Sequence, residues 1–162
     1  MRRFRILLMS VAVVVLGLCV AAGAQLTPEL QDQLAKSKYV YISTARKNGS
    51  FGKPAEIWFL FHNGSVYVAS PPTTFRVRRI KAGRNQARIA AGKPDGPSFV
   101  ARGAVVNEPD MYPILFDTYA KKYPDGWGQF EQKFKTGLKD GSRLLIKYTP
   151  TGAVTPAAGG KE

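Results

Sequence analysis

Cysteine, histidine and acidic residues are all scarce in this chain of 162 residues. It has one cysteine, Cys19, one histidine, His62, and 11 acidic residues against 24 lysines and arginines. Histidine-dependent hydrolytic triads, metal sites built from several histidines or cysteines, and a disulfide within the chain are therefore excluded. His62 falls in a predicted turn, where we expect it to face solvent. A chain this poor in acid–base groups is expected either to bind a ligand or to take its chemistry from a cofactor.

The N-terminal residues 1–24 have the pattern of a secretory signal peptide. Three arginines among the first five residues precede an apolar run over 6–20, and the small residues 22–24 (Ala-Gly-Ala) follow it. This order predicts cleavage before Gln25 and an exported protein, periplasmic or extracellular. The alternative is a retained N-terminal membrane anchor, because the apolar run is only slightly shorter than the roughly 20 residues of a membrane span.

The chain stays strongly basic without this segment. Its formal charge is +13, and removing the three arginines leaves 13 − 3 = +10 on residues 25–162. Such a balance indicates a polyanionic partner or a solvated basic surface. Nucleic acid is not an expected partner, because the protein is expected to be exported and no nucleic-acid-binding motif is present. Phosphate-bearing small molecules, anionic lipid headgroups or cell-wall polymers remain as partners, and weak association with an anionic envelope surface is a further expectation.

Strand and turn signals dominate the remaining chain. Asn-Gly turns between β-rich runs predict an antiparallel meander, and the expected strands are 39–45, 55–61, 65–70, 87–93, 98–108 and 142–154. Helices are expected from Pro28, over 73–82, from Pro109 and over 128–138, with a break at the sequence YPDGW. This order predicts one mainly β domain over 25–154, a small antiparallel barrel of six strands with helical insertions, followed by a disordered tail over 155–162.

Several residues inside these elements have a specific expectation. The aromatic side chains of the helical insertion are expected to pack in the core or at a dimer contact, the alternative being a lid over a ligand groove; they are Tyr112, Tyr119, Tyr123 and Trp127. Gly103 is expected to allow a close backbone approach in its strand. Glu56 is expected to face outward from its strand.

The stretch Val66–Ile80, VYVASPPTTFRVRRI, concentrates the groups that bind anions. A strand ends at Ser70, and Thr73 or Thr74 then begins a helix that carries Arg76 in its first turn. Free N–H groups at a helix start and an arginine fork both suit phosphate. Two interpretations remain open here: a phosphate site, or a capped surface helix whose arginines are only solvated.

The same stretch contributes to a resemblance that covers about residues 30–154. The segment YVYISTARKNGSFGKPAEIWFLF resembles the opening hairpin and Trp-Phe strand of the pyridoxamine 5'-phosphate oxidase-like split-barrel flavoproteins and their F420-binding relatives. GSVYVASPPTTFRVRRI is similar to that family's strand, hydroxyl, loop and hydroxyl-x-basic helix. VARGAVV and LLIKYTPTGAV resemble its Gly-Ala strand and its closing strand.

The resemblance implies a split barrel, a homodimer, and FMN or F420 bound in a groove between the subunits. By position, the cofactor-binding residues would be Ser70, Thr74, Arg76 and Arg79 at the phosphate, and Ile57 and Trp58 beside the ring, largely through their backbone. No catalytic side chain and no metal ligand is implied. The oxidases proper often have a basic residue where Phe75 stands and an arginine near Glu56. True pyridoxamine-phosphate oxidase activity is therefore not expected.

Three functions remain as hypotheses. The first is an oxidoreductase that uses FMN or F420 for hydride transfer on a small organic substrate. The second is a non-enzymatic exported binding module for an anionic ligand such as haem or a phosphorylated metabolite. The third is a basic envelope-surface protein without a small-molecule site.

Overall fold

A computed structural model of the protein describes residues 24–155 and contains one antiparallel sheet and four helices. The elements in chain order are α1 (Pro28–Lys36), β1 (Val40–Thr44), β2 (Ala55–Ile57), β3 (Leu60–His62), β4 (Ser65–Ser70), α2 (Phe75–Lys81), β5 (Gln86–Ala91), β6 (Ser98–Val106), α3 (Met111–Lys122), α4 (Pro124–Asp140) and β7 (Leu144–Thr155). Apart from Ala24 and Thr155, the expected signal peptide and tail lie outside the described residues. Within this described range, no helix combines the length and apolarity needed to cross a membrane.

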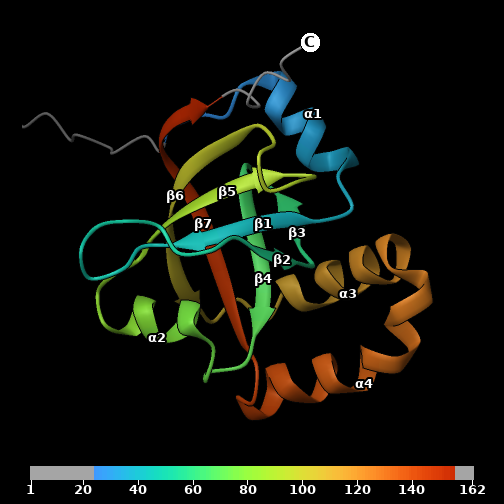
Figure 1. Ribbon diagram of the computed structural model, residues 1–162. Coiled ribbons are helices and arrows are strands. Elements are labelled where there is room, and N and C mark those ends of the chain that lie inside the picture. The colour runs from blue at the N-terminus through green and yellow to red at the C-terminus, as the bar shows by residue number, and fades with distance from the viewer. Residues whose placement is uncertain (1–23, 156–162) are drawn as a thin grey trace, which may run out of the picture.

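The sheet is curled so that its two edges are consecutive pieces of chain. Its strand order is β2-β1-β5-β6-β7-β4-β3, and only Trp58 and Phe59 separate β2 from β3. One extended segment therefore pairs with β1 through its first half and with β4 through its second half. The curled sheet and its flanking helices are visible in Figure 1. This is the expected split barrel.

The strand count differs from the expectation of six because this segment is divided. The sequence predicts one strand over 55–61, whereas the structure has β2 and β3 and hence seven strands. The large apolar run Ile57–Phe61 continues without interruption through Trp58 and Phe59, so nothing local in the sequence marks the point at which the segment leaves one neighbouring strand for the other. The meander itself is confirmed, and the His62–Ser65 turn has the positive φ angles at Asn63 (46°) and Gly64 (71°) that an Asn-Gly hairpin requires.

Two hydrophobic clusters lie on opposite faces of β4, which is buried along its whole length. Val66 and Val68 face the barrel interior, which α1 covers with Leu30 and Leu34. Tyr67 belongs to the second cluster, between the barrel wall and helices α3 and α4. A strand buried on both faces needs a continuous apolar run rather than an alternating one, and VYVA supplies it.

The helical insertion is longer than expected. The sequence YPDGW predicts a break over five residues, but the chain changes direction only at Tyr123 (φ −128°, ψ 51°), and α4 begins at Pro124. Proline is tolerated at the first helical position because its missing N–H has no helical partner there. Gly126 and Gly128 are thus helical. The expected α1 start is confirmed: Thr27 caps the helix by accepting from the Leu30 N–H at 3.3 Å.

Two tyrosines of the α3–α4 insertion form hydrogen bonds with the backbone of Trp58 and Phe59, the two residues between β2 and β3. The Tyr119 hydroxyl donates to the Trp58 carbonyl at 2.9 Å, and the Phe59 N–H donates to the Tyr123 hydroxyl at 3.0 Å. Tyr123 in turn donates to the Lys38 carbonyl at 2.7 Å. The Trp58 indole stacks on the Tyr123 ring at 4.3 Å with an interplanar angle of 5°. The expectation of core packing is confirmed for Tyr119, Tyr123 and Trp127, which are buried, whereas Tyr112 is half-buried against their cluster.

We predict that Tyr123→Phe lowers the free energy of unfolding by about 2 kcal/mol, because it leaves the Phe59 N–H and the Lys38 carbonyl without their partner. Equilibrium urea unfolding measures the loss. Tyr112→Phe is the matched control: its hydroxyl lies 3.5 Å from the Leu138 carbonyl, too far for a strong bond, so its cost is expected to be about 0.5 kcal/mol or less. Equal costs for the two variants would contradict this account.

Gly103 lies in close contact with two side chains, whereas the sequence predicts a close approach of another backbone. A Cβ there would lie 2.6 Å from Cε1 of Tyr148 and 3.0 Å from Cδ1 of Ile80. Tyr148 is its partner across the β6–β7 pair, so the aromatic ring covers the glycine inside the barrel.

Gly103→Ala is therefore expected to destabilise the protein by about 1–3 kcal/mol, the usual cost of overpacking a core. In α4, Gly128 has no atom within 4 Å of an added Cβ, so Gly128→Ala should stabilise the helix by roughly 0.5–1 kcal/mol. Thermal or urea unfolding of both variants gives the comparison. A neutral Gly103→Ala would show that the Tyr148 ring can move aside at no cost.

Candidate functional site

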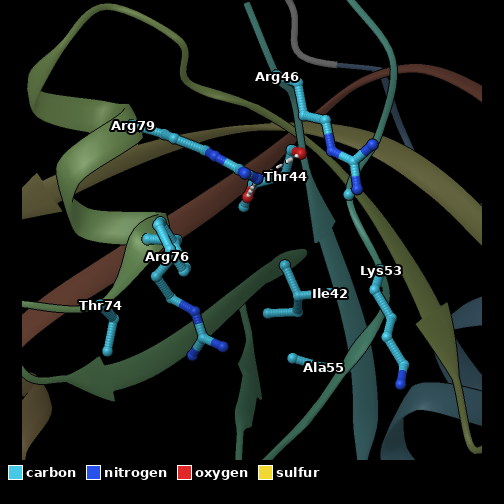
Figure 2. A pocket seen from close by; sticks show the side chains of 10 residues that line it. Ile42, Thr44, Arg46, Lys53, Ala55, Thr74, Arg76 and Arg79 are labelled. Carbon is cyan, nitrogen blue, oxygen red and sulfur yellow. Dashed lines mark hydrogen bonds between the residues drawn. The ribbon is translucent and has the colours of Figure 1, made fainter.

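A basic groove lies between α2 and the β1–β2 connection. Its volume is about 450 Å³, and its lining residues are Ile42, Thr44, Arg46, Gly52, Lys53, Ala55, Thr74, Phe75, Arg76 and Arg79. Figure 2 shows Arg76 entering from the α2 side and Lys53 from the opposite wall, with Ile42 and Ala55 between them. The groove thus has a small apolar floor and cationic walls.

Arg76 is held in place by the end of β4. Its Nη1 donates to the Ser70 hydroxyl at 3.0 Å, and Ser70 itself is buried. Burial lowers the pKa of Arg76, although arginine remains protonated at any pH at which proteins are studied. One of the five guanidinium N–H groups is used in this bond, so the others can reach a ligand. The sequence-predicted pair Ser70 and Arg76 is therefore brought together.

Thr74 stands at the start of α2 but does not cap it. Its hydroxyl donates to the Pro71 carbonyl at 2.9 Å, and no side chain caps the helix N-terminus. The expected helix over 73–82 is seven residues long, from Phe75 to Lys81. Thr74 lines the groove, so it remains a candidate ligand-contacting residue.

Arg79 ties α2 to the end of β1. Its Nη1 donates to the Thr44 hydroxyl at 2.6 Å and to the Thr44 carbonyl at 3.0 Å; Figure 2 shows both bonds. A Cβ at position 52 would lie 3.1 Å from this same Nη1, so Gly52 leaves space for the guanidinium. Arg79 is consequently a structural clamp that also lines the groove.

Arg46 and Lys53 are groove cations that were not predicted from the sequence. Both are exposed and lie in the connection between β1 and β2. The sequence holds one weak signal for them: basic residues flank the Asn-Gly turn of that connection. No pattern in the sequence shows that the connection folds back toward α2.

Among residues 24–155, no carboxylate lines the groove. The ion pairs found among residues 24–155 are Asp32–Lys36, Lys93–Asp95, Glu131–Lys135 and Glu108–Lys147, all elsewhere. Glu56 is exposed and accepts a hydrogen bond from the Tyr41 hydroxyl, which confirms its outward orientation. That bond raises the pKa of Tyr41. The carboxylate therefore does not oppose an anion in the groove.

Ile57 and Trp58 do not line the groove. The Trp58 ring packs among Tyr119, Tyr123 and Phe134 in the second cluster, and its carbonyl is occupied by Tyr119. Ile57 packs against the barrel core. The proposed contact of these two residues with a cofactor ring stays a prediction.

Tyr148 lies inside the barrel near Arg76. Among the described residues its buried hydroxyl has no hydrogen-bond partner. Burial raises the pKa of Tyr148 to about 12, and the positive charge of Arg76 acts in the opposite direction. The hydroxyl therefore stays protonated and is a donor, not a base, at neutral pH.

Comparisons with known proteins show the fold. No family model and no curated protein matches the sequence. A Listeria innocua protein described as a pyridoxamine 5'-phosphate oxidase matches in structure with a TM-score of 0.54 and 11% identity, over 78% of this chain and 94% of that one. HutZ, the haem storage protein of Vibrio cholerae, gives 0.51 and 13%, over 82% and 95%. The Mycobacterium tuberculosis protein Rv2991 gives 0.55 and 12%, over 77% and 80%.

This chain therefore has the split-barrel fold of the pyridoxamine 5'-phosphate oxidase-like proteins, as the resemblance in sequence implies. At identities of 11%, 13% and 12%, the similarity shows the fold alone. Because similar proteins include both a described oxidase and a haem storage protein, the fold alone does not decide the ligand.

The Ser70–Arg76 contact can be tested by a double-mutant cycle. Ser70→Ala, Arg76→Met and the double variant are expected to show a coupling energy of about 1 kcal/mol in urea unfolding, because the two side chains share one hydrogen bond. Thr73→Ala, at an exposed position beside the site, should not couple to Arg76→Met. Additivity of Ser70→Ala and Arg76→Met within about 0.3 kcal/mol would show that the bond does not fix the guanidinium.

Proposed function

We propose that the protein is an exported flavin- or deazaflavin-binding oxidoreductase that anchors the phosphate of FMN or F420 at Arg76. The observation that supports this most is the groove itself: Arg46, Lys53, Arg76 and Arg79 line it, and no carboxylate does. Guanidinium groups bind phosphate through charge-assisted hydrogen bonds. A volume of about 450 Å³ also lies within the usual range for small-molecule and cofactor sites.

The residues present fit such a cofactor. Arg76, kept in position by Ser70, would hold the phosphate together with Thr74, while Lys53 on the opposite wall adds a second positive charge. Ile42 and Ala55 supply an apolar surface for part of a ring. When bound, a flavin or deazaflavin would supply the hydride chemistry. The chain would contribute phosphate binding, ring orientation and exclusion of water, and none of these needs an acid–base side chain.

The proposal includes a homodimer with the groove near the subunit contact, as the resemblance implies. Val105 and Ile114 are large apolar side chains with 37% exposure each. Size-exclusion chromatography with light scattering measures the mass directly, and a monomer would remove this part of the proposal without affecting the groove.

Non-enzymatic haem binding is a second candidate function. The structural similarity to HutZ favours it, and the groove cations could pair with haem propionates. The only histidine, His62, lies on the β3–β4 hairpin and does not line the groove. An axial histidine from the groove itself is therefore not available.

The test is a fluorescence-monitored titration with FMN, F420 and haem. FMN or F420 should bind in the micromolar range, and Arg76→Ala should weaken that binding by about 1.5–3 kcal/mol, the value of a hydrogen bond to a charged group. A Soret band with haem and no flavin binding would favour the second candidate. No binding of any of the three would contradict both functions.

Arg102→Ala is the matched control, since Arg102 is exposed on β6 and does not line the groove. Its binding should stay within twofold of the wild-type protein. Arg143 is less suitable, because its guanidinium lies 4.1 Å from the Phe134 ring centroid and its loss would disturb packing. Equal losses from Arg76→Ala and Arg102→Ala would mean that only general positive charge attracts the ligand.

A further inference from the structure

A second basic hollow adjoins the groove beyond Arg79. Its volume is about 240 Å³, and its lining residues are Arg46, Lys47, Phe75, Arg78, Arg79 and Arg84. Three of these, Arg46, Phe75 and Arg79, also line the groove. The two spaces therefore adjoin. Among residues 24–155, the second is lined by five cations and by no carboxylate.

One wall of this hollow is built by the end of α2. Gly83 has a left-handed φ of 77°, its N–H donates to the Ile80 carbonyl at 3.0 Å, and the Arg84 N–H donates to the Arg79 carbonyl at 2.9 Å. These two bonds form a Schellman motif, which turns the chain back beside the last helical turn. Arg84 is thereby placed next to Arg79. Its Nε is buried and has no hydrogen-bond partner among the described residues.

The opposite wall is a hydrogen-bonded turn in the β1–β2 connection. The Arg46 N–H donates to the Ser50 carbonyl at 2.8 Å, and the Gly49 N–H donates to the Arg46 carbonyl at 3.1 Å. The Asn48 side chain accepts from the Ser50 N–H at 3.1 Å. Arg46 and Lys47 therefore extend from a backbone that is already ordered, which lowers the entropy lost when they bind an anion.

Phe75 stands between the two spaces as an exposed aromatic ring. Its side chain is 69% exposed, the largest exposure among the large hydrophobic residues described. The guanidinium carbons of Arg78 and Arg79 lie 5.7 Å and 5.6 Å from its centroid. Exposed rings beside cations are the arrangement on which heteroaromatic bases stack in nucleotide-binding proteins.

We propose that the hollow is a second phosphate subsite, so that the site takes an elongated ligand with phosphate at two places, of the oligophosphate or dinucleotide class. This inference rests on the proposed function, in which the first phosphate lies beside Arg76. One phosphate monoester carries at most two negative charges, so it leaves most of the seven cations that line the two adjoining spaces without a counter-charge. A second phosphate bound between Arg46 and Arg84 supplies the missing negative charge. If these cations merely complement the C-terminal end of the α2 dipole, they contribute to stability and not to binding.

The experiment compares orthophosphate with tripolyphosphate by isothermal titration calorimetry at constant ionic strength. Tripolyphosphate is expected to bind at least tenfold more tightly. The variant Lys47→Gln/Arg84→Gln should reduce that advantage to about twofold while orthophosphate and FMN affinities stay unchanged. The control Lys93→Gln/Arg102→Gln removes the same charge at exposed positions outside both spaces and should leave the advantage intact.

The outcomes separate this inference from the proposed function. FMN binding with no advantage for tripolyphosphate, or an equal loss in both double variants, would overturn the second subsite alone. If tripolyphosphate binds more tightly than orthophosphate, this difference depends on Lys47 and Arg84, and no flavin binds, the result would support the subsite and contradict the proposed function. Phe75→Ala identifies the ligand class: a weaker affinity for FAD with unchanged tripolyphosphate binding would support a dinucleotide, and unchanged affinities for both would support an oligophosphate.

Discussion

The hydrogen bonds of Tyr119 and Tyr123 to the backbone at Trp58 and Phe59 are the constraint on which the barrel depends. At these two positions the segment between β2 and β3 leaves one sheet edge before it joins the other, so its peptide groups lack ladder partners. An unpaired buried peptide group costs as much as a lost hydrogen bond. Burial also raises the pKa of both tyrosines, so both hydroxyls keep the proton that they donate. The insertion α3–α4 is thus part of the barrel wall rather than an appendage.

The position of the groove follows from the way in which the ends of β4 and β1 hold α2. Ser70 is the last residue of β4 and Thr44 the last of β1, and each binds one arginine of α2. A short helix that would be unstable alone is consequently fixed at two points of the sheet. The arginines used as clamps are half-buried and oriented, whereas Arg46 and Lys53 on the facing connection are exposed. The groove therefore combines one wall of half-buried, hydrogen-bonded arginines with one wall of exposed cations.

The sequence predicts the individual helices, strands and turns well, but it predicts poorly which distant segments contact one another. The Asn-Gly turn, the Thr27 cap and the fully apolar strand VYVA each follow from local rules, and the structure has all three. The Ser70–Arg76 pair could also be anticipated, since the two residues lie close in sequence on either side of the junction between β4 and α2. The division of the 55–61 segment at Trp58 and the position of Arg46 in the groove depend instead on which distant strand or helix packs against each of them. Neither feature leaves a local pattern in the sequence.

The direction of the Trp58 side chain could not be predicted from the sequence either. Its place on the second strand suggests a ligand contact, but the ring is stacked on Tyr123 and faces the helical insertion. Side-chain direction on a strand depends on register, and a shift of one residue exchanges the two faces. The irregular backbone at the split adds a change of direction that alternation along a regular strand does not predict.

The tyrosine contacts also determine when the barrel can close during folding. Tyr123 bonds to residues 64 and 85 positions away along the chain, among the longer separations that a domain of this size allows. Contacts of such separation form only after much chain entropy has been lost, which makes them slow. Before α3 docks, the segment from β2 to β3 is an unprotected sheet edge, open to hydrogen exchange with solvent and to pairing with another molecule. Docking of the two tyrosines thus protects the peptide groups of Trp58 and Phe59 from such exchange and pairing.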